Sequence, residues 1–160
     1  MAQRDEGAPP ESDAVVREMR IDASPETVFD FFVDPDKMTR WKGRSADLDP
    51  TPGGGYRVEI SERAIIVGEY VEIDPPRRVV FTFGWEGGET PVGPGSTTVE
   101  VTLRPDGEGT LVRLVHAGLP REARADHSEG WKHYLGRLAT AVAGGDPGPD
   151  TYGSRERPES

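Results

Sequence analysis

The hydrophobic pattern of the chain is clearest between residues 126 and 143, where it predicts one long amphipathic helix. Apolar or aromatic side chains recur there at steps of three and four residues, which places them on one face of an α-helix: His127, Trp131, Leu135, Leu138 and Val142. Gly144 and Gly145 follow, and glycine at this position is typical of a helix end. A helix with one apolar face needs an apolar surface to cover. Because the rest of the sequence is rich in short strand patterns, we expect that surface to be a sheet.

The strand patterns lie mainly between residues 56 and 116, where apolar and polar positions alternate and turn residues separate the runs. The predicted strands are residues 56–60, 64–73, 77–85, 96–104 and 110–116, with a further strand at 14–21 and a weak one at 47–50. Consecutive strands on short turns predict an antiparallel meander. The glycine-rich residues 51–55 are interpreted as a turn, because they lack the Lys-Ser/Thr pair of a phosphate-binding loop.

Two strands decide which side chains the long helix covers. In residues 110–116, Leu114 and His116 are expected to face the helix, because the opposite face carries Arg113. Residues 64–73 are ambiguous. Their inner face carries either Glu69 or, in the other phase, Tyr70 together with Glu72.

Two short helices are expected before the meander. Ser24 followed by Pro25 is a typical helix start, and Asp34 followed by Pro35 ends this helix and begins a second turn that carries Trp41 inward. The order of a strand, two short helices, a meander and a long helix predicts an α+β fold. In this fold a curved antiparallel sheet wraps around the C-terminal helix.

Length and composition add limits to this picture. The 160 residues suit a single domain, expected at residues 14–144, while residues 1–13 and 145–160 are rich in proline, glycine and acidic residues and are expected to be disordered tails. The absence of cysteine excludes disulfides and thiolate metal sites. The net charge of −10 argues against nucleic acid or an anionic membrane as a partner. With no signal-peptide pattern and no long apolar run, we expect a cytoplasmic protein.

A series of short motifs then identifies a family. The motifs are ASPETVF at 23–29, DPDKM at 34–38 with Trp41, GGGY at 53–56, GEYVEIDPP at 68–76 leading to VFTF at 80–83, and LVHAGL at 114–119 leading to Gly130-Trp131. In this order they resemble the START-like (SRPBCC) superfamily, and within it the homologues of the activator of heat-shock protein 90 ATPase. One departure is that these homologues often have a second aromatic residue and a proline after the position of Trp41, where this chain has Lys42 and Gly43.

The resemblance implies a helix-grip fold with a cavity between the sheet and the C-terminal helix. A small hydrophobic molecule, either a lipid or an aromatic metabolite, is the partner expected there. The expected lining residues are Phe32, Trp41, Tyr56, Tyr70, Phe81, Phe83, Trp85, Val101, Leu114, His116, Trp131 and Leu135. The alternatives are an enzyme similar to polyketide cyclases and dehydratases, and a regulator of a chaperone ATPase.

Among the polar residues, His116 is the most suggestive, because an inward imidazole can change charge near neutral pH. If the protein is an enzyme, Tyr70, His116 and one of Glu69 or Glu72 are its acid/base candidates, but no catalytic residue is assigned. The three histidines have no glutamate at metal-ligand spacing, so no metal site is expected. We also expect no cofactor, and either a monomer or a homodimer.

Overall fold

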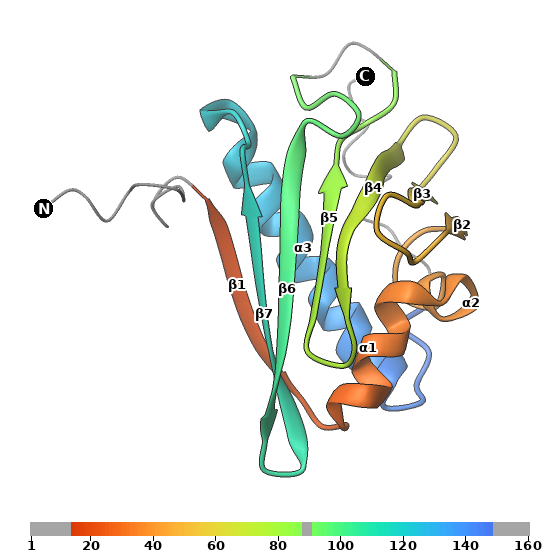
Figure 1. Cartoon of the computed structure of the whole chain (residues 1–160), viewed down its shortest axis with the longest axis vertical. Coiled ribbons are helices and arrows are strands. Elements are labelled where there is room, and N and C mark those ends of the chain that lie inside the picture. The colour runs from red at the N-terminus through yellow and green to blue at the C-terminus, as the bar shows by residue number, and fades with distance from the viewer. Residues whose placement is uncertain (1–13, 88–90, 149–160) are drawn as a thin grey trace, which may run out of the picture.

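The structure, a computed structural model, describes residues 14–87 and 91–148, and its strands form one antiparallel sheet (Figure 1). The strands are β1 (Val15–Ile21), β2 (Ser45–Leu48), β3 (Gly55–Glu59), β4 (Ile65–Asp74), β5 (Arg78–Phe83), β6 (Thr97–Asp106) and β7 (Gly109–Ala117). Their order in the sheet is β1-β7-β6-β5-β4-β3-β2, and each neighbouring pair is antiparallel. The predicted meander is therefore confirmed, and β1 extends it beside β7.

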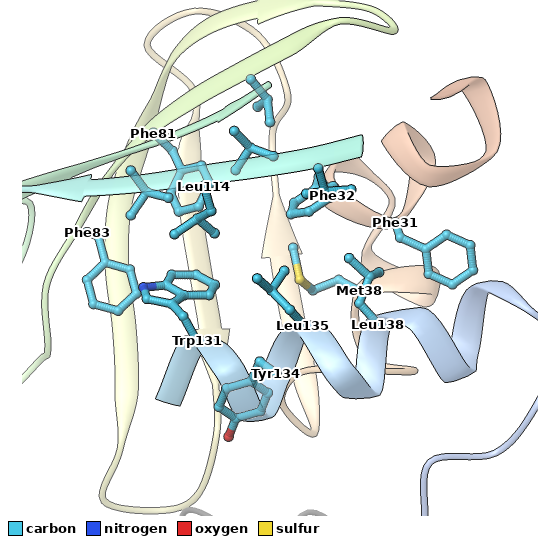
Figure 2. Packing of buried hydrophobic residues seen from close by; sticks show 14 of the residues in the cluster. Phe31, Phe32, Met38, Phe81, Phe83, Leu114, Trp131, Tyr134, Leu135 and Leu138 are labelled. Carbon is cyan, nitrogen blue, oxygen red and sulfur yellow. The ribbon is translucent and has the colours of Figure 1, made fainter. Parts of the chain in front are cut away.

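Helix α3 (Arg121–Val142) crosses one face of this sheet, and the shorter helices α1 (Pro25–Val33) and α2 (Pro35–Met38) lie near its β2–β4 end (Figure 1). This arrangement of a curved seven-stranded sheet around a long C-terminal helix confirms the α+β helix-grip fold. The hydrophobic core lies between the sheet and α3 (Figure 2). None of the helices in the described ranges has the length and apolar character needed to span a bilayer.

The short helices begin and end where the sequence predicts. The Ser24 hydroxyl accepts a hydrogen bond from the Thr27 amide at the start of α1. Asp34 ends α1 and also begins α2, where its carboxylate accepts from the Asp36 and Lys37 amides. The turn that follows buries Trp41, whose indole Nε1 donates to the backbone oxygen of Phe31 at 2.9 Å. These contacts fix the segment that leads into β2.

Helix α3 starts at Arg121, five residues before the predicted start at 126. The predicted start rests on the apolar stripe, which begins at His127 and leaves out the charged residues 121–126. They are good helix formers, however, and Ala123 is buried on the core side of their first turn. The end is as predicted, since Gly144 adopts a φ of +92° after the last helical turn.

A β-bulge resolves the ambiguous strand. The pairing of β4 with β5 shifts register between Tyr70 and Glu72. Tyr70 points into the core, Val71 is 51% exposed, and Glu72 lies on the outer face. Each of the two phases considered from the sequence thus fails along part of the strand, because one extra residue changes which side faces inward.

The remaining differences are small. β2 lies at Ser45–Leu48 instead of residues 47–50, because it pairs with β3 from Glu59 to Tyr56. Residues 51–55 form the predicted turn up to the first residue of β3. The expected tail at residues 1–13 and all but residues 145–148 of the expected tail at 145–160 lie outside the described residues, so the domain boundaries remain predictions.

Candidate functional site

The residues expected to line a cavity lie in the core between the sheet and the helices (Figure 2). The buried ones are Phe32, Trp41, Tyr56, Tyr70, Phe81, Phe83, Val101, Leu114, His116, Trp131 and Leu135. Trp85 is half-buried and packs against the same core. The structure thus brings the expected set together, and its aromatic rings form two groups.

The first aromatic group joins β3, β4 and β5. Tyr56 stacks on Phe81 with ring centroids 4.3 Å apart, and Tyr70 meets Tyr56 edge to face at 5.5 Å. The Tyr70 hydroxyl donates to the backbone oxygen of Phe32 at 2.9 Å. Burial raises the pKa of Tyr70 well above its ordinary value, so this hydroxyl stays protonated. Closely packed rings with a satisfied hydroxyl are typical of a structural core.

The second aromatic group contains His116 on β7. This residue is fully buried, and each of its two ring nitrogens has a hydrogen-bond partner. Nδ1 accepts from Trp131 Nε1 at 3.0 Å, and Nε2 lies 2.8 Å from Thr97 Oγ1. The Thr97 hydroxyl donates to the backbone oxygen of Phe83 at 2.7 Å, so its oxygen accepts from the imidazole. His116 is therefore a neutral imidazole that carries its proton on Nε2. Burial is the main cause that lowers the pKa of His116 to about 2.

His127 on α3 holds a second tryptophan in a similar way. Its Nε2 accepts from Trp85 Nε1 at 3.0 Å, and its Nδ1 lies 2.8 Å from the backbone oxygen of Ala123. Burial is again the main cause that lowers the pKa of His127. His116 and His127 thus act as acceptors that fix two indole rings, and neither has a nitrogen left for acid/base work.

Among the described residues, Lys42 has a buried side-chain polar group that no other group satisfies. It lies between α2 and β2, is 2% exposed, and its Nζ has no hydrogen-bond partner within the described part of the chain. Nζ lies 4.1 Å from the centroid of the Trp131 ring. It lies 5.5 to 5.9 Å from the rings of Phe83, Trp41 and Tyr134. We call these four rings the aromatic cage of Lys42.

The backbone around Lys42 is held from three sides. The Lys42 amide donates to the backbone oxygen of Met38 at 2.9 Å, and Arg137 Nε of α3 donates to the backbone oxygen of Trp41 at 2.9 Å. Gly43 has a φ of +88°, and a Cβ there would lie 2.5 Å from a side-chain carbon of β3. Glycine at this position therefore lets the chain approach the sheet closely enough to bury the lysine.

Burial lowers the pKa of Lys42 from 10.5 to about 7. The face of Trp131 attracts the charged form, and a desolvated contact of this kind contributes ~2 kcal/mol or more. A pKa drop of this size corresponds to about 5 kcal/mol, so desolvation is the larger effect. Near neutral pH a large share of the Lys42 amines carries no charge.

The other acid/base candidates are not part of this site. Glu69 is exposed, and Glu72 lies on the outer face, where its carboxylate accepts from Arg78 Nε at 3.0 Å. The bulge at residue 71 is the reason that Glu72 does not point inward. Neither Glu69 nor Glu72 therefore points toward His116 and Tyr70, and the predicted acid/base set does not converge in the structure.

Metal binding finds no support in the part of the chain that the structure describes, where no group of three or more His, Cys, Asp or Glu side chains is placed to hold an ion. The sequence analysis did not select Lys42 as a functional residue. The available signal was the departure at residues 42–43 from the pattern of the resembled family, directly after the inward Trp41.

Comparisons with known proteins agree with this architecture. The family model described as "Activator of Hsp90 ATPase homolog 1-like protein" matches residues 22–143. No significant match is found among curated proteins. Among solved structures, the chain is similar to the AHSA1-like protein of Rhizobium etli, with 46% sequence identity, a TM-score of 0.68 and 86% of each chain covered.

Two other solved structures are similar at lower identity. DynU16, a protein of the dynemicin biosynthetic locus, has 25% identity and a TM-score of 0.74, with 84% of this chain and 49% of that chain covered. CalU16 from Micromonospora echinospora has 25% identity and a TM-score of 0.67, with 81% of this chain and 76% of that chain covered. The chain thus spans about half the length of DynU16.

Proposed function

Since this chain belongs to the family of activator of Hsp90 ATPase homolog 1-like proteins, within the START-like superfamily, we propose that it binds a small apolar molecule between the sheet and α3. The buried aromatic residues offer flat apolar surface for such a molecule. Fixed indole rings at Trp85 and Trp131 favour a preformed contact surface, because little side-chain freedom is lost on binding.

The single observation that carries the proposal is the unpartnered amine of Lys42. A buried polar group without a hydrogen bond costs roughly 1–3 kcal/mol, and folded proteins contain few of them. Lys42 lies among four aromatic rings at the contact between α3 and β5. A bound molecule with an apolar body and one polar atom would satisfy the amine and cover the rings at the same time.

Titration with methylnaphthalene, an apolar probe of aromatic type, tests this function. The readout is the methyl region of a carbon–proton NMR correlation spectrum. We expect saturable shifts at Leu114, Leu135 and Val101, which are buried between the layers, and none at Val71, which is 51% exposed on the outer face. Shifts confined to Val71, or no saturable shift for any apolar probe of this size, would contradict the proposal.

Two other functions remain to be tested against it. An acid/base enzyme is suggested by the locus of DynU16, but the occupied nitrogens of His116 favour binding over proton transfer by this residue. Regulation of a chaperone ATPase is suggested by the description of the family. A direct assay of chaperone ATPase rate with and without the protein decides the second alternative.

A further inference from the structure

We propose that Lys42 is a reactive amine that captures an apolar aldehyde or ketone as an imine inside its aromatic cage. This inference rests on the proposed function, because the carbonyl compound would bind at the same place, among the side chains between the sheet and α3. It deepens that function by naming the chemical class of the ligand and the residue that binds it.

The position of Lys42 distinguishes it from the other lysines. The chain has three lysines, Lys37, Lys42 and Lys132. Lys132 is exposed on α3, and Lys37 is half-buried in α2 with its amine 5.9 Å from the Phe31 ring. Lys42 alone among them is buried, and its Nζ lacks a hydrogen-bond partner within the described residues. Its lone pair is therefore not engaged with any described group when the amine is neutral.

Desolvation also sets the protonation state that the reaction needs. Only a neutral amine attacks a carbonyl carbon, and a lysine in an apolar environment is activated by its lowered pKa. The pKa of about 7 leaves a neutral fraction near neutral pH that is on the order of a thousand times that of an ordinary lysine. The two histidines that interact electrostatically with Lys42, His116 and His127, are neutral and bonded on both nitrogens.

The surroundings favour a carbonyl over a carboxylate. A carboxylate buried beside Lys42 would need further donors for its second oxygen. The nearby donors are committed: Trp131 Nε1 to His116, and the Thr97 hydroxyl to Phe83. A carbonyl group makes smaller demands, because its oxygen leaves during the reaction and the remaining carbon chain is apolar.

The reaction balances with these two partners alone. The nitrogen lone pair of Lys42 forms a bond to the carbonyl carbon, and the π electron pair moves to the oxygen. The oxygen takes up the first of the two amine protons to give a carbinolamine. The carbon–oxygen bond then breaks, the nitrogen gives up its second proton, and the hydroxyl leaves with that proton as water. The net change is one amine and one carbonyl compound converted to one imine and one water, without an oxidant or a reductant.

Access to the amine is expected past Tyr134. Tyr134 as a residue is 8% exposed, the largest value in the cage, compared with 1% for Trp41, 2% for Phe83 and 4% for Trp131. Figure 2 shows its hydroxyl directed away from the core residues around Leu135. A smaller side chain at residue 134 would therefore open the cage without removing the contacts that hold the Lys42 backbone.

The test is reductive trapping with naphthaldehyde and cyanoborohydride near neutral pH, followed by peptide mass spectrometry. The expected product carries the mass of the aldehyde less one oxygen atom on the Lys42 peptide. We expect labelling of Lys42 to exceed that of Lys37 and Lys132 by at least about tenfold at about pH 7, because only Lys42 is both desolvated and surrounded by aromatic rings that can hold the aldehyde. Tyr134→Ala is expected to increase the rate of labelling at Lys42 and to leave Lys132 unchanged.

The control compound is methylnaphthalene, which has the same rings and no carbonyl. If it binds between the layers while naphthaldehyde labels only Lys37 and Lys132, the imine proposal is wrong and the proposed binding function stands. If neither compound binds there and Lys42 is not labelled, both fail. Lys42→Met is expected to abolish specific labelling, because it removes the amine that forms the imine. If this variant does not fold, competition at wild-type Lys42 replaces it. Methylnaphthalene should then lower the labelling of Lys42 by naphthaldehyde, and unchanged labelling would contradict the proposal.

Discussion

At the scale of the residue, Lys42 makes the stability of the protein depend on pH. The unfolded chain binds more protons at this residue than the folded protein between about pH 7 and 10.5, so the folded state becomes more stable as pH rises through this window. We expect Lys42→Met to be more stable than the wild type at neutral pH. The difference in the free energy of unfolding should narrow by about 2 kcal/mol from about pH 7 to about pH 9.

Urea denaturation at several pH values measures this effect. Lys132→Met is the matched control, because residue 132 is exposed. The free energy of unfolding of this variant, plotted against pH, should run parallel to that of the wild type. Parallel curves for Lys42→Met and the wild type would show that the amine is solvated in the folded protein.

The His116 side chain should keep the same charge over the pH range in which an ordinary histidine takes up a proton. Its pKa is lowered to about 2, so the folded protein keeps the imidazole neutral while the unfolded chain takes up a proton below about pH 6.5. The contribution of His116 to stability is present at neutral pH and is lost progressively as pH falls below that value. Side-chain nitrogen NMR should show a neutral ring protonated on Nε2 from about pH 8 to about pH 5. A titration of His116 within this range would mean that the bonds to Trp131 and Thr97 are not maintained.

The site was predictable from the sequence only in part. Alternation along residues 110–116 placed His116 toward the helix, and the structure confirms that orientation. Its hydrogen-bond partners were not predictable, because Thr97 and Trp131 come from other elements and their distances depend on the packed fold. Lys42 was missed because a lysine in a turn is ordinarily exposed. Its burial depends on close approach of the chain at Gly43, which no local pattern shows.

At the scale of the element, β4 shows why strand faces were harder to predict than strand positions. The segment and its turn signals were correct, but hydrophobic alternation assumes a constant period of two. The register shift between Tyr70 and Glu72 breaks that period, and it is set by the pairing with β5. The start of α3 was also missed because the prediction followed hydrophobic periodicity. Residues 121–126 have good helix propensity, but only Ala123 among them packs against the core, so they show no apolar stripe.

The long helix offers a test of its own energetics at Gly136. A Cβ at this position would meet no atom within 4 Å, so an alanine fits without steric cost. Gly136→Ala should raise the free energy of unfolding by ~0.5–1 kcal/mol, because alanine loses less backbone entropy in a helix. Thermal unfolding followed by circular dichroism measures the change.

Gly68→Ala in β4 is the contrasting control, since its Cβ would lie 1.9 Å from the backbone oxygen of Thr82. We expect this variant to lose more than ~2 kcal/mol, because the backbone of β5 must move. If Gly136→Ala were as destabilising as Gly68→Ala, the space described around α3 would be wrong.

At the scale of the whole molecule, the order of elements was enough to predict the fold, and the ligand was not predictable. A meander followed by a long amphipathic helix has few ways to bury both apolar faces, and the helix-grip arrangement is one of them. A ligand, by contrast, depends on a few polar atoms inside that core. In this chain the decisive atom is Lys42 Nζ, which belongs to a residue where the sequence departs from the pattern of the resembled family.

The same architecture predicts that the described domain unfolds as one unit. A single core cluster joins residues from every helix and every strand, and it contains Trp41 and Trp131, with Trp85 at its margin. Breaking the contact of α3 with the sheet would expose both buried indoles and remove the cover of β5 to β7, so neither layer is expected to persist alone. Tryptophan fluorescence and far-ultraviolet circular dichroism should therefore give coincident urea transitions. If fluorescence changed at a lower urea concentration than circular dichroism, α3 would detach first, and access to the Lys42 cage would then proceed by opening of the helix instead of displacement of the Tyr134 ring.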